Sequence, residues 1–159
     1  NVFVLVLFAI FAMTIVAVLA LGANQYKSLV DRDNNAYNKR IITSYVSAQI
    51  RGYDRADAVK VGGFTSPDVD DEVNTLHLLE TIDGIRYDLK IYYYQGKVYE
   101  LFAAEESEMK PEDGVAIMDA KDLHFEKKGS LIRITSKDSE GRENETTVSL
   151  RSEESGVAL

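Results

Sequence analysis

The sequence contains no cysteine and only two histidines, His77 and His124. Without cysteine the chain has no disulfide framework, no thiolate zinc site, no cysteine nucleophile and no cysteine to carry a lipid anchor. Two histidines leave little material for a histidine-based metal site. The redox compartment stays open, because a cysteine-free protein is stable in any of them.

Charge is missing from one end of the chain. Residues 2–23 contain no Asp, Glu, Lys or Arg, so all 26 acidic and 18 basic side chains of the 159 residues lie in the remaining body. The formal net charge of -8 therefore belongs to that body. Because an acidic body repels phosphates, we do not expect a nucleic-acid partner. The length fits one domain of about 100–150 residues.

The charge-free run reads NVFVLVLFAIFAMTIVAVLALGA, and Thr14 is its one polar side chain after Asn1. As a helix, about 22 residues span about 33 Å, which is enough to cross the hydrocarbon core of a bilayer. A helix also satisfies its own backbone groups, as a bilayer demands. We therefore expect residues 2–23 to form a transmembrane helix that spans a membrane at some stage.

Three interpretations compete for this run. A signal peptide needs a basic start, an apolar stretch of roughly 7–15 residues and a small-residue cleavage site. This run has no basic start and is longer, and Val18-Leu19-Ala20 is only a passable site. The second interpretation is a simple anchor for an extracytoplasmic domain. The third is a filament subunit whose processing peptidase cuts ahead of the apolar run, which a chain opening at Asn1 favours.

The helix is expected to continue beyond the apolar run. Residues 24–53 contain no proline, and their first glycine is Gly52. Apolar and aromatic residues recur at helical spacing between polar ones, which predicts an amphipathic helix. The residues expected to pack on the rest of the protein are Tyr26, Val30, Tyr37, Ile41, Tyr45 and Ala48.

Beyond this helix the pattern changes. Gly62-Gly63, Ser66-Pro67 and an acidic run mark a loop over residues 54–74. Alternating apolar residues then predict strands, with Asp83-Gly84 and Gln95-Gly96 as hairpin turns. The expected strands are 75–81, 85–94, 97–103, 122–127, 130–136 and 145–151, and residues 114–120 are expected to form a helical turn or a loop.

The expected fold class is therefore α+β. A sheet of six short strands needs an element that buries its apolar face, and the stripe of residues 24–53 is the one long candidate. We expect a long N-terminal helix, apolar in its first half, whose second half packs on an antiparallel head. The expected divisions are 1–23 apolar helix, 24–53 amphipathic continuation, 54–74 loop and 75–159 head.

This order of elements resembles type IV pilins and pseudopilins over nearly the whole chain. The stretch VFVLVLFAIFAMTIVAVLALGANQYKSLVDRD is similar to an uncharacterised family of single-pass Firmicutes proteins associated with pilus and tight-adherence systems. The segments IRYDLKIYYYQGKVYELFA and LIRIT look like the sheet of Gram-positive pilin-like heads. One departure is Leu5, because type IV pilins usually carry glutamate at the fifth mature position.

The resemblance implies a function of assembly and no enzymatic activity. Prepilin peptidase would process the chain, which would wait in the cytoplasmic membrane through residues 2–23 and then join an extracellular filament with itself and other pilins. No cofactor or metal is implied, and an adhesive role would follow. The residues expected to mediate assembly are Val2, Phe3, Leu5, Phe8, Ala9, Phe11, Ala12, Ala17, Ala20 and Gly22.

Other functions remain open on the sequence alone. Leu5 favours a minor or tip pilin, or a single-pass anchored binding domain. A membrane-tethered enzyme would need converging polar groups, and no nucleophile or nucleotide-binding motif is present. Asp31-x-Asp33-x-Asn35 resembles the opening of a calcium loop but lacks the later Gly and Glu. The acidic groups at 68–72 and 105–113 are interpreted as solvated charge, and both histidines as structural.

Overall fold

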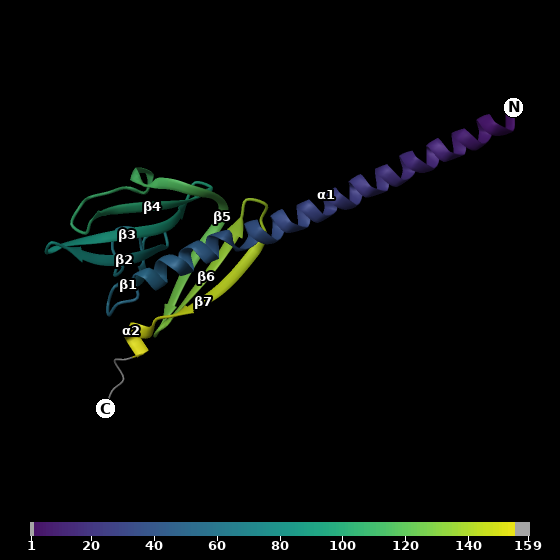
Figure 1. The fold of residues 1–159 in the computed structure, drawn as a ribbon. Helices are drawn as coiled ribbons and strands as arrows, with labels where there is room; N and C mark the ends of the chain where they lie inside the picture. Colours follow the sequence, from purple (N-terminus) through teal and green to yellow (C-terminus); the bar gives the residue numbers. More distant parts are fainter. Residues whose placement is uncertain (1, 155–159) are drawn as a thin grey trace. The chain divides into compact units, whose positions relative to one another are not determined.

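The computed structural model describes residues 2–154, apart from the side chains of residues 17, 20–39, 153 and 154. The chain forms two compact units, Asn1–Asn38 and Lys39–Leu159. The first unit is helical. The second holds all the strands of the described residues, and we call it the β unit (Figure 1).

The helix α1 spans Val2–Gly52. It continues for 51 residues because no proline interrupts it, and it ends at a glycine, which favours a helix interior less than any residue except proline. Arg51 lies in its last turn, where a cation interacts favourably with the helix dipole. Within the part of the chain that the structure describes, no helix is both long enough and apolar enough to cross a membrane.

Seven antiparallel strands form one sheet in the order of the sequence, β1-β2-β3-β4-β5-β6-β7. Each strand pairs with the next along the chain, so the sheet is a continuous meander. The strands are β1 Val59–Gly62, β2 Thr75–Ile82, β3 Ile85–Tyr94, β4 Lys97–Ala104, β5 Val115–Lys128, β6 Leu131–Asp138 and β7 Glu143–Ser149. Two short helices complete the fold, the 3-10 helix η1 Pro111–Asp113 and α2 Arg151–Glu154.

The predicted hairpin turns are confirmed. Asp83 and Gly84 have φ angles of 50° and 83°, and Gln95 and Gly96 have 45° and 85°. Two successive positive φ angles are the mark of the tight turn that suits the twist of a hairpin. The predicted helical turn or loop at 114–120 is wrong, because residues 115–120 form the first part of β5.

Strand β5 connects the two halves of the sheet. Its first residues pair with β4 and its last with β6, and the register shifts between Ala120 and Asp122. A shift of this kind bends a strand and increases its twist. One 14-residue strand can therefore serve both halves.

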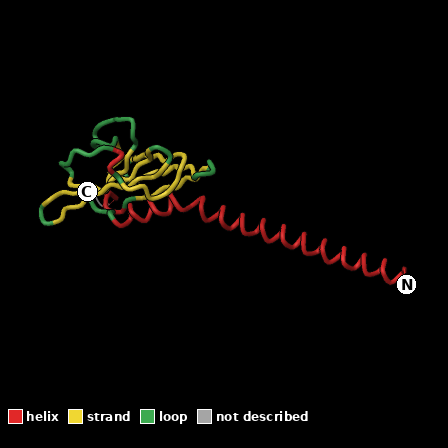
Figure 2. The backbone as a smooth tube through the Cα atoms, turned by 90° about the horizontal axis from the view of Figure 1, so that it is seen from above, coloured by secondary structure: helices red, strands yellow, loops and turns green. Residues whose placement is uncertain are grey.

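The main core lies between the last turns of α1 and one face of the sheet (Figures 1 and 2). Ile42, Val46 and Ile50 are at most 1% exposed and lie one helical turn apart. Their partners come from all strands from β1 to β7, including Leu78, Ile91 and Phe125, and from Leu150 after β7, so the end of α1 closes the core of the whole unit.

The predicted packing stripe needs a correction. Ile41 is 39% exposed and Ala48 is exposed, while Tyr45 is partly buried against the core. The buried stripe begins at Ile42 instead, rotated by about 100° around the helix. Because Ile41 and Ile42 are both apolar, the spacing of apolar residues in the sequence did not show which of the two belongs to the buried stripe. The side chains of Tyr26, Val30 and Tyr37 lie outside the described residues.

The expected fold class is also wrong. The compact β unit begins only at Lys39 and is mostly β, with one seven-stranded antiparallel sheet as its body. The helix contributes residues 39–52 to this unit, so a long helix whose whole second half lies across a sheet does not organise the fold. The short strand β1 was not predicted, and it forms because Val59 and Val61 pair with Leu78 and Leu76 of β2.

The opposite face of β2–β4 is covered by loops instead of a helix. Phe64, Tyr92 and Leu101 form a second buried cluster there. Phe64 comes from the segment between β1 and β2, and its ring meets Tyr92 edge-on at 4.9 Å. This half of the sheet is therefore buried on both faces.

Candidate functional site

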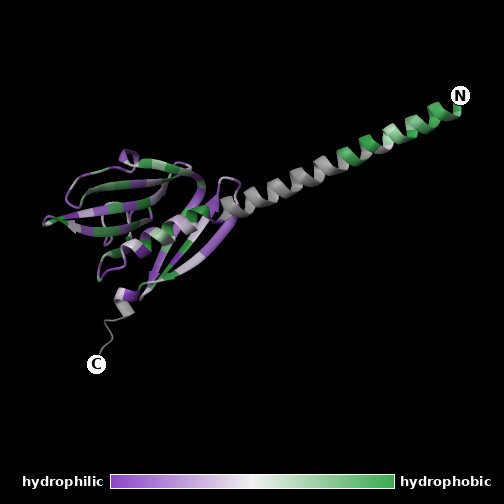
Figure 3. Cartoon of the chain, viewed as in Figure 1, coloured by the Kyte–Doolittle hydropathy of each residue, from purple (hydrophilic) through white to green (hydrophobic). Residues whose placement is uncertain are grey.

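The described part of the apolar run is exposed on every side of α1. Figure 3 shows its hydrophobic colouring at the N-terminal end of the helix. We call residues 2–19 the apolar segment. Fourteen large hydrophobic side chains in it are at least 44% exposed, and they are Val2, Phe3, Val4, Leu5, Val6, Leu7, Phe8, Ile10, Phe11, Met13, Ile15, Val16, Val18 and Leu19. Seven of them are consecutive, and successive helix positions turn by about 100°, so no side of the segment is polar.

The remaining described side chains of the apolar segment are either small or form their hydrogen bond within the helix. Thr14 donates its hydroxyl to the Ile10 carbonyl at 2.7 Å, so its polar group is bonded within the helix. Ala9 and Ala12 are exposed between the large side chains. The side chains of the other predicted assembly residues, Ala17, Ala20 and Gly22, lie outside the described residues.

His77 is a buried structural residue, as the sequence predicted. Its ring is 0% exposed and lies between two acceptors, with Asp88 Oδ2 at 2.7 Å from Nδ1 and the Gly63 carbonyl at 2.8 Å from Nε2. Lys90 lies beside it and donates to the Phe64 carbonyl at 2.8 Å. These contacts hold the segment after β1 against the sheet and leave no path for a substrate to reach the imidazole.

Asp71 fixes the same segment from its other end. Its carboxylate accepts backbone N–H groups of Phe64 at 2.8 Å, Thr65 at 2.9 Å and Val73 at 3.1 Å. Burial alone raises the pKa of Asp71, but these three backbone donors stabilise the anion and the net result is a pKa below the usual value. The carboxylate is therefore a loop clamp and is unavailable to a cation.

The other predicted acidic residues do not converge. Asp68, Asp70 and Glu72 are exposed, as are Glu105, Glu106 and Glu108. Among the residues with described side chains, no group of three or more His, Asp or Glu is placed to hold a metal ion. The side chains of the calcium-like Asp31-x-Asp33-x-Asn35 sequence lie outside that set.

Tyr92 is a buried structural residue of β3. Tyr92 is 0% exposed and donates its hydroxyl to the Pro111 carbonyl at 2.8 Å. Burial, with nearby acidic groups, raises its pKa to about 12. Tyr92 therefore holds the turn before β5 in place and does not stack on a ligand.

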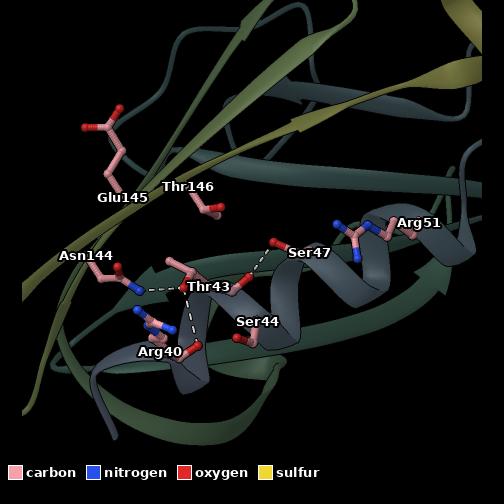
Figure 4. Close-up of a pocket in the computed structure, with 8 residues that line it drawn as sticks. All are labelled: Arg40, Thr43, Ser44, Ser47, Arg51, Asn144, Glu145 and Thr146. Carbon is pink, nitrogen blue, oxygen red and sulfur yellow. Dashed lines mark hydrogen bonds between the residues drawn. The ribbon is translucent and has the colours of Figure 1, made fainter. Parts of the chain in front are cut away.

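One polar groove lies between the end of α1 and β7 (Figure 4). It encloses about 430 Å³, and its lining residues are Arg40, Thr43, Ser44, Ser47, Arg51, Asn144, Glu145 and Thr146. We call it the α1–β7 groove. None of these residues was singled out for binding from the sequence, because the two segments are about a hundred positions apart and neither carries a motif.

Hydrogen bonds fix the walls of the α1–β7 groove. The Asn144 side-chain amide donates to the Thr43 hydroxyl at 2.7 Å, and the Ser47 hydroxyl donates to the Thr43 carbonyl at 2.6 Å (Figure 4). Arg40 and Arg51 are exposed at the helix wall, and neither has an ion-pair partner within the described part of the chain. The groove thus presents two cations beside several hydroxyl groups.

The comparisons with known proteins add a family and no function. A protein-family model matches residues 37–139, and its description is "Domain of unknown function (DUF4860)". No curated protein and no solved structure matches the chain. The matched region begins close to the start of the β unit, and both the apolar segment and β7 lie outside it.

Proposed function

We propose that this chain, which belongs to the family described as Domain of unknown function (DUF4860), is a structural subunit that assembles with copies of itself. The apolar segment is the assembling part, and the acidic β unit stays in water. We propose that the assembly is a surface filament outside the cell, that the chain waits in the cytoplasmic membrane before joining it, and that the protein is not an enzyme.

The observation that carries this proposal is the exposure of fourteen large apolar side chains around one helix. Burying such a side chain is worth about 1.5–3 kcal/mol, so the whole segment is strongly unfavourable in water. Isolated apolar patches of this extent mark interaction sites on soluble proteins. An apolar surrounding must therefore cover the segment on every side.

Identical helices supply such a surrounding. Ala9 and Ala12 lie among the large side chains and allow neighbouring helices to approach closely. Helices in an apolar surrounding associate through such close packing, because burial against another helix gains no more hydrophobic free energy than burial in lipid. Contacts between unlike faces of identical subunits produce an open filament when the rotation between subunits does not close into a ring. Because residue 5 is Leu5 instead of the glutamate usual in pilins, no buried carboxylate at that position would set the register between neighbouring subunits.

A single-pass anchored domain, or a minor or tip subunit, is the second candidate. The same exposed side chains favour it, because lipid tails would cover them equally well. In that case the chain would remain in the membrane, or occur only at the end of a filament made of another protein.

The test is detergent removal from the purified full-length chain, followed by sedimentation and electron microscopy. We expect ordered filaments from the unmodified chain. The variant Phe8→Lys/Phe11→Lys places two charges in the apolar segment and should remain unassembled. Val115→Lys is the matched control, because Val115 is 69% exposed but lies in the β unit, and it should assemble normally.

Two results would count against self-assembly. Amorphous aggregates from all three chains would show that the segment merely collapses without forming specific contacts. Quantitative recovery of single copies in lipid discs, with no filament on cells that express the protein, would favour the anchored domain. The two candidates therefore differ in the state of the chain in a native membrane.

A further inference from the structure

Strand β7 is an outer strand of the sheet, and residues on its outer edge border the α1–β7 groove. The flanking bonds from Leu150 N–H to the Ser130 carbonyl and from Asp138 N–H to the Arg142 carbonyl fix which residues bond to β6. Because bonded pairs alternate along an antiparallel ladder, Glu145 and Thr147 direct their backbone groups away from β6. Within the described residues, those backbone groups have no hydrogen-bond partner.

The β7 edge lacks the usual protection against strand pairing. Natural edge strands are kept from pairing by short length, charged side chains, proline, bulges or a covering element. The edge strand β1 has four residues, whereas β7 has seven, no proline and a regular register with β6. Its two carboxylates are compensated, because Glu143 lies 2.9 Å from Lys137 and Glu145 lies 3.2 Å from Arg133.

The helix beside this edge supplies a matching charge pattern. Arg40 and Arg51 are eleven positions apart on α1, which corresponds to about 16 Å along the helix. An extended chain covers that distance in about five residues. Ser44 and Ser47 lie between Arg40 and Arg51 along the helix and also line the groove.

We infer that the β7 edge binds an extended acidic segment of a partner polypeptide by strand addition. The segment pairs its backbone with Glu145 and Thr147, and carboxylates at alternate positions face Arg40 and Arg51. Main-chain bonds of this kind supply affinity, and the side chains of alternate residues supply specificity. The occupant is acidic because the two arginines are the uncompensated charges of the groove among the described residues.

The experiment uses the full-length chain as single copies in detergent micelles, so it does not depend on assembly through the apolar segment. The probe is a synthetic peptide of about ten residues in which glutamate alternates with threonine or valine, since a strand of this length spans the edge. A second peptide replaces glutamate with lysine. A third keeps glutamate but carries N-methyl groups on alternate backbone nitrogens, which removes its donors toward β7.

We expect the acidic peptide to bind at least about tenfold more tightly than either control peptide, because each control loses one set of contacts. Hydrogen exchange of the Glu145 and Thr147 amides should slow on binding. Thr147→Pro removes an outward N–H without removing a bond to β6, so it should abolish binding, while Thr147→Ala should not. Arg40→Gln/Arg51→Gln should weaken binding, and the distant Arg86→Gln should not.

Three results would overturn the inference. Equal binding of the N-methylated peptide would exclude strand addition, and equal binding of the lysine peptide would exclude recognition by the arginines. Protection of the β7 amides without peptide, at concentrations where the β units associate, would make a second copy of the chain the occupant. The peptide controls keep the test decisive even if Thr147→Pro fails to fold.

Discussion

Single residues at buried polar positions hold the loops of the β unit in place. His77, Lys90 and Asp71 bind backbone groups of the segment after β1, and Asp138 binds the backbone of Glu140 and Arg142. Backbone groups in loops need such partners because no neighbouring strand satisfies them. The polar chemistry of this protein is therefore directed at its own main chain.

Asp71→Asn should destabilise the β unit by about 1–3 kcal/mol near neutral pH, because an amide cannot accept all three backbone bonds. The folded pKa of Asp71 lies below its unfolded value. The stabilisation that the Asp71 carboxylate provides is therefore complete above about pH 4, near the ordinary pKa of aspartate. It is lost as the pH falls through the folded pKa.

The measurement is denaturant unfolding of both chains at several pH values. The difference between wild type and Asp71→Asn should shrink as the solution becomes more acidic. Asp70→Asn is the matched control, since Asp70 is the exposed neighbour, and it should change stability by less than about 0.5 kcal/mol. A pH-independent difference would mean that the carboxylate charge is not what matters.

At the scale of elements, the end of α1 and the sheet depend on one narrow contact. Three residues one turn apart, Ile42, Val46 and Ile50, carry the helix side of the main core. Beside this stripe, Thr43, Ser44 and Ser47 line the α1–β7 groove, and Tyr45 is partly buried against the core. The orientation of α1 about its own axis therefore decides which residues are available for binding.

Ile42→Ala and Ile41→Ala test this orientation with one substitution at two adjacent positions. Ile42 is 1% exposed, so its truncation should cost about 2–5 kcal/mol of unfolding free energy. Ile41 is 39% exposed, and its truncation should cost well under about 1 kcal/mol. Chemical denaturation of the two variants in the same detergent measures both. Equal costs would contradict the observed helix face.

Local chemistry made part of this fold predictable. The two glycine turns at 84 and 96 and the alternating strand 85–94 follow from short-range rules, and the structure agrees with them. The start of β5 and the strand β1 did not follow, because both form only where a neighbouring strand is already present. The α1–β7 groove was also out of reach, because Thr43 and Asn144 meet only through the tertiary fold.

At the scale of the whole molecule, the apolar segment and the β unit present opposite kinds of surface. Among the side chains that the structure describes, the buried helix residues of the main core are Ile42, Val46 and Ile50. The net charge of -8 lies outside residues 2–23. We therefore expect stability and assembly to respond to different substitutions.

Phe8→Ala and Phe125→Ala separate these two properties. Phe8 is 69% exposed, so its removal should leave thermal unfolding of the β unit unchanged while it weakens assembly. Phe125 is 1% exposed, so its removal should cost about 3–5 kcal/mol and lower the unfolding temperature. Calorimetry in detergent and sedimentation after detergent removal give the two readouts. A lowered unfolding temperature in Phe8→Ala would show that the units are energetically coupled.

The sequential strand order also bears on how the chain emerges from the ribosome. Each strand finds its partner in the segment synthesised just before it, so every hairpin closes a short loop at low entropic cost. The core, however, joins Ile42 to Leu150, from the two ends of the unit. The nascent chain must therefore leave part of its core uncovered until the last strand is made, which makes that interval the one in which a chaperone would be needed.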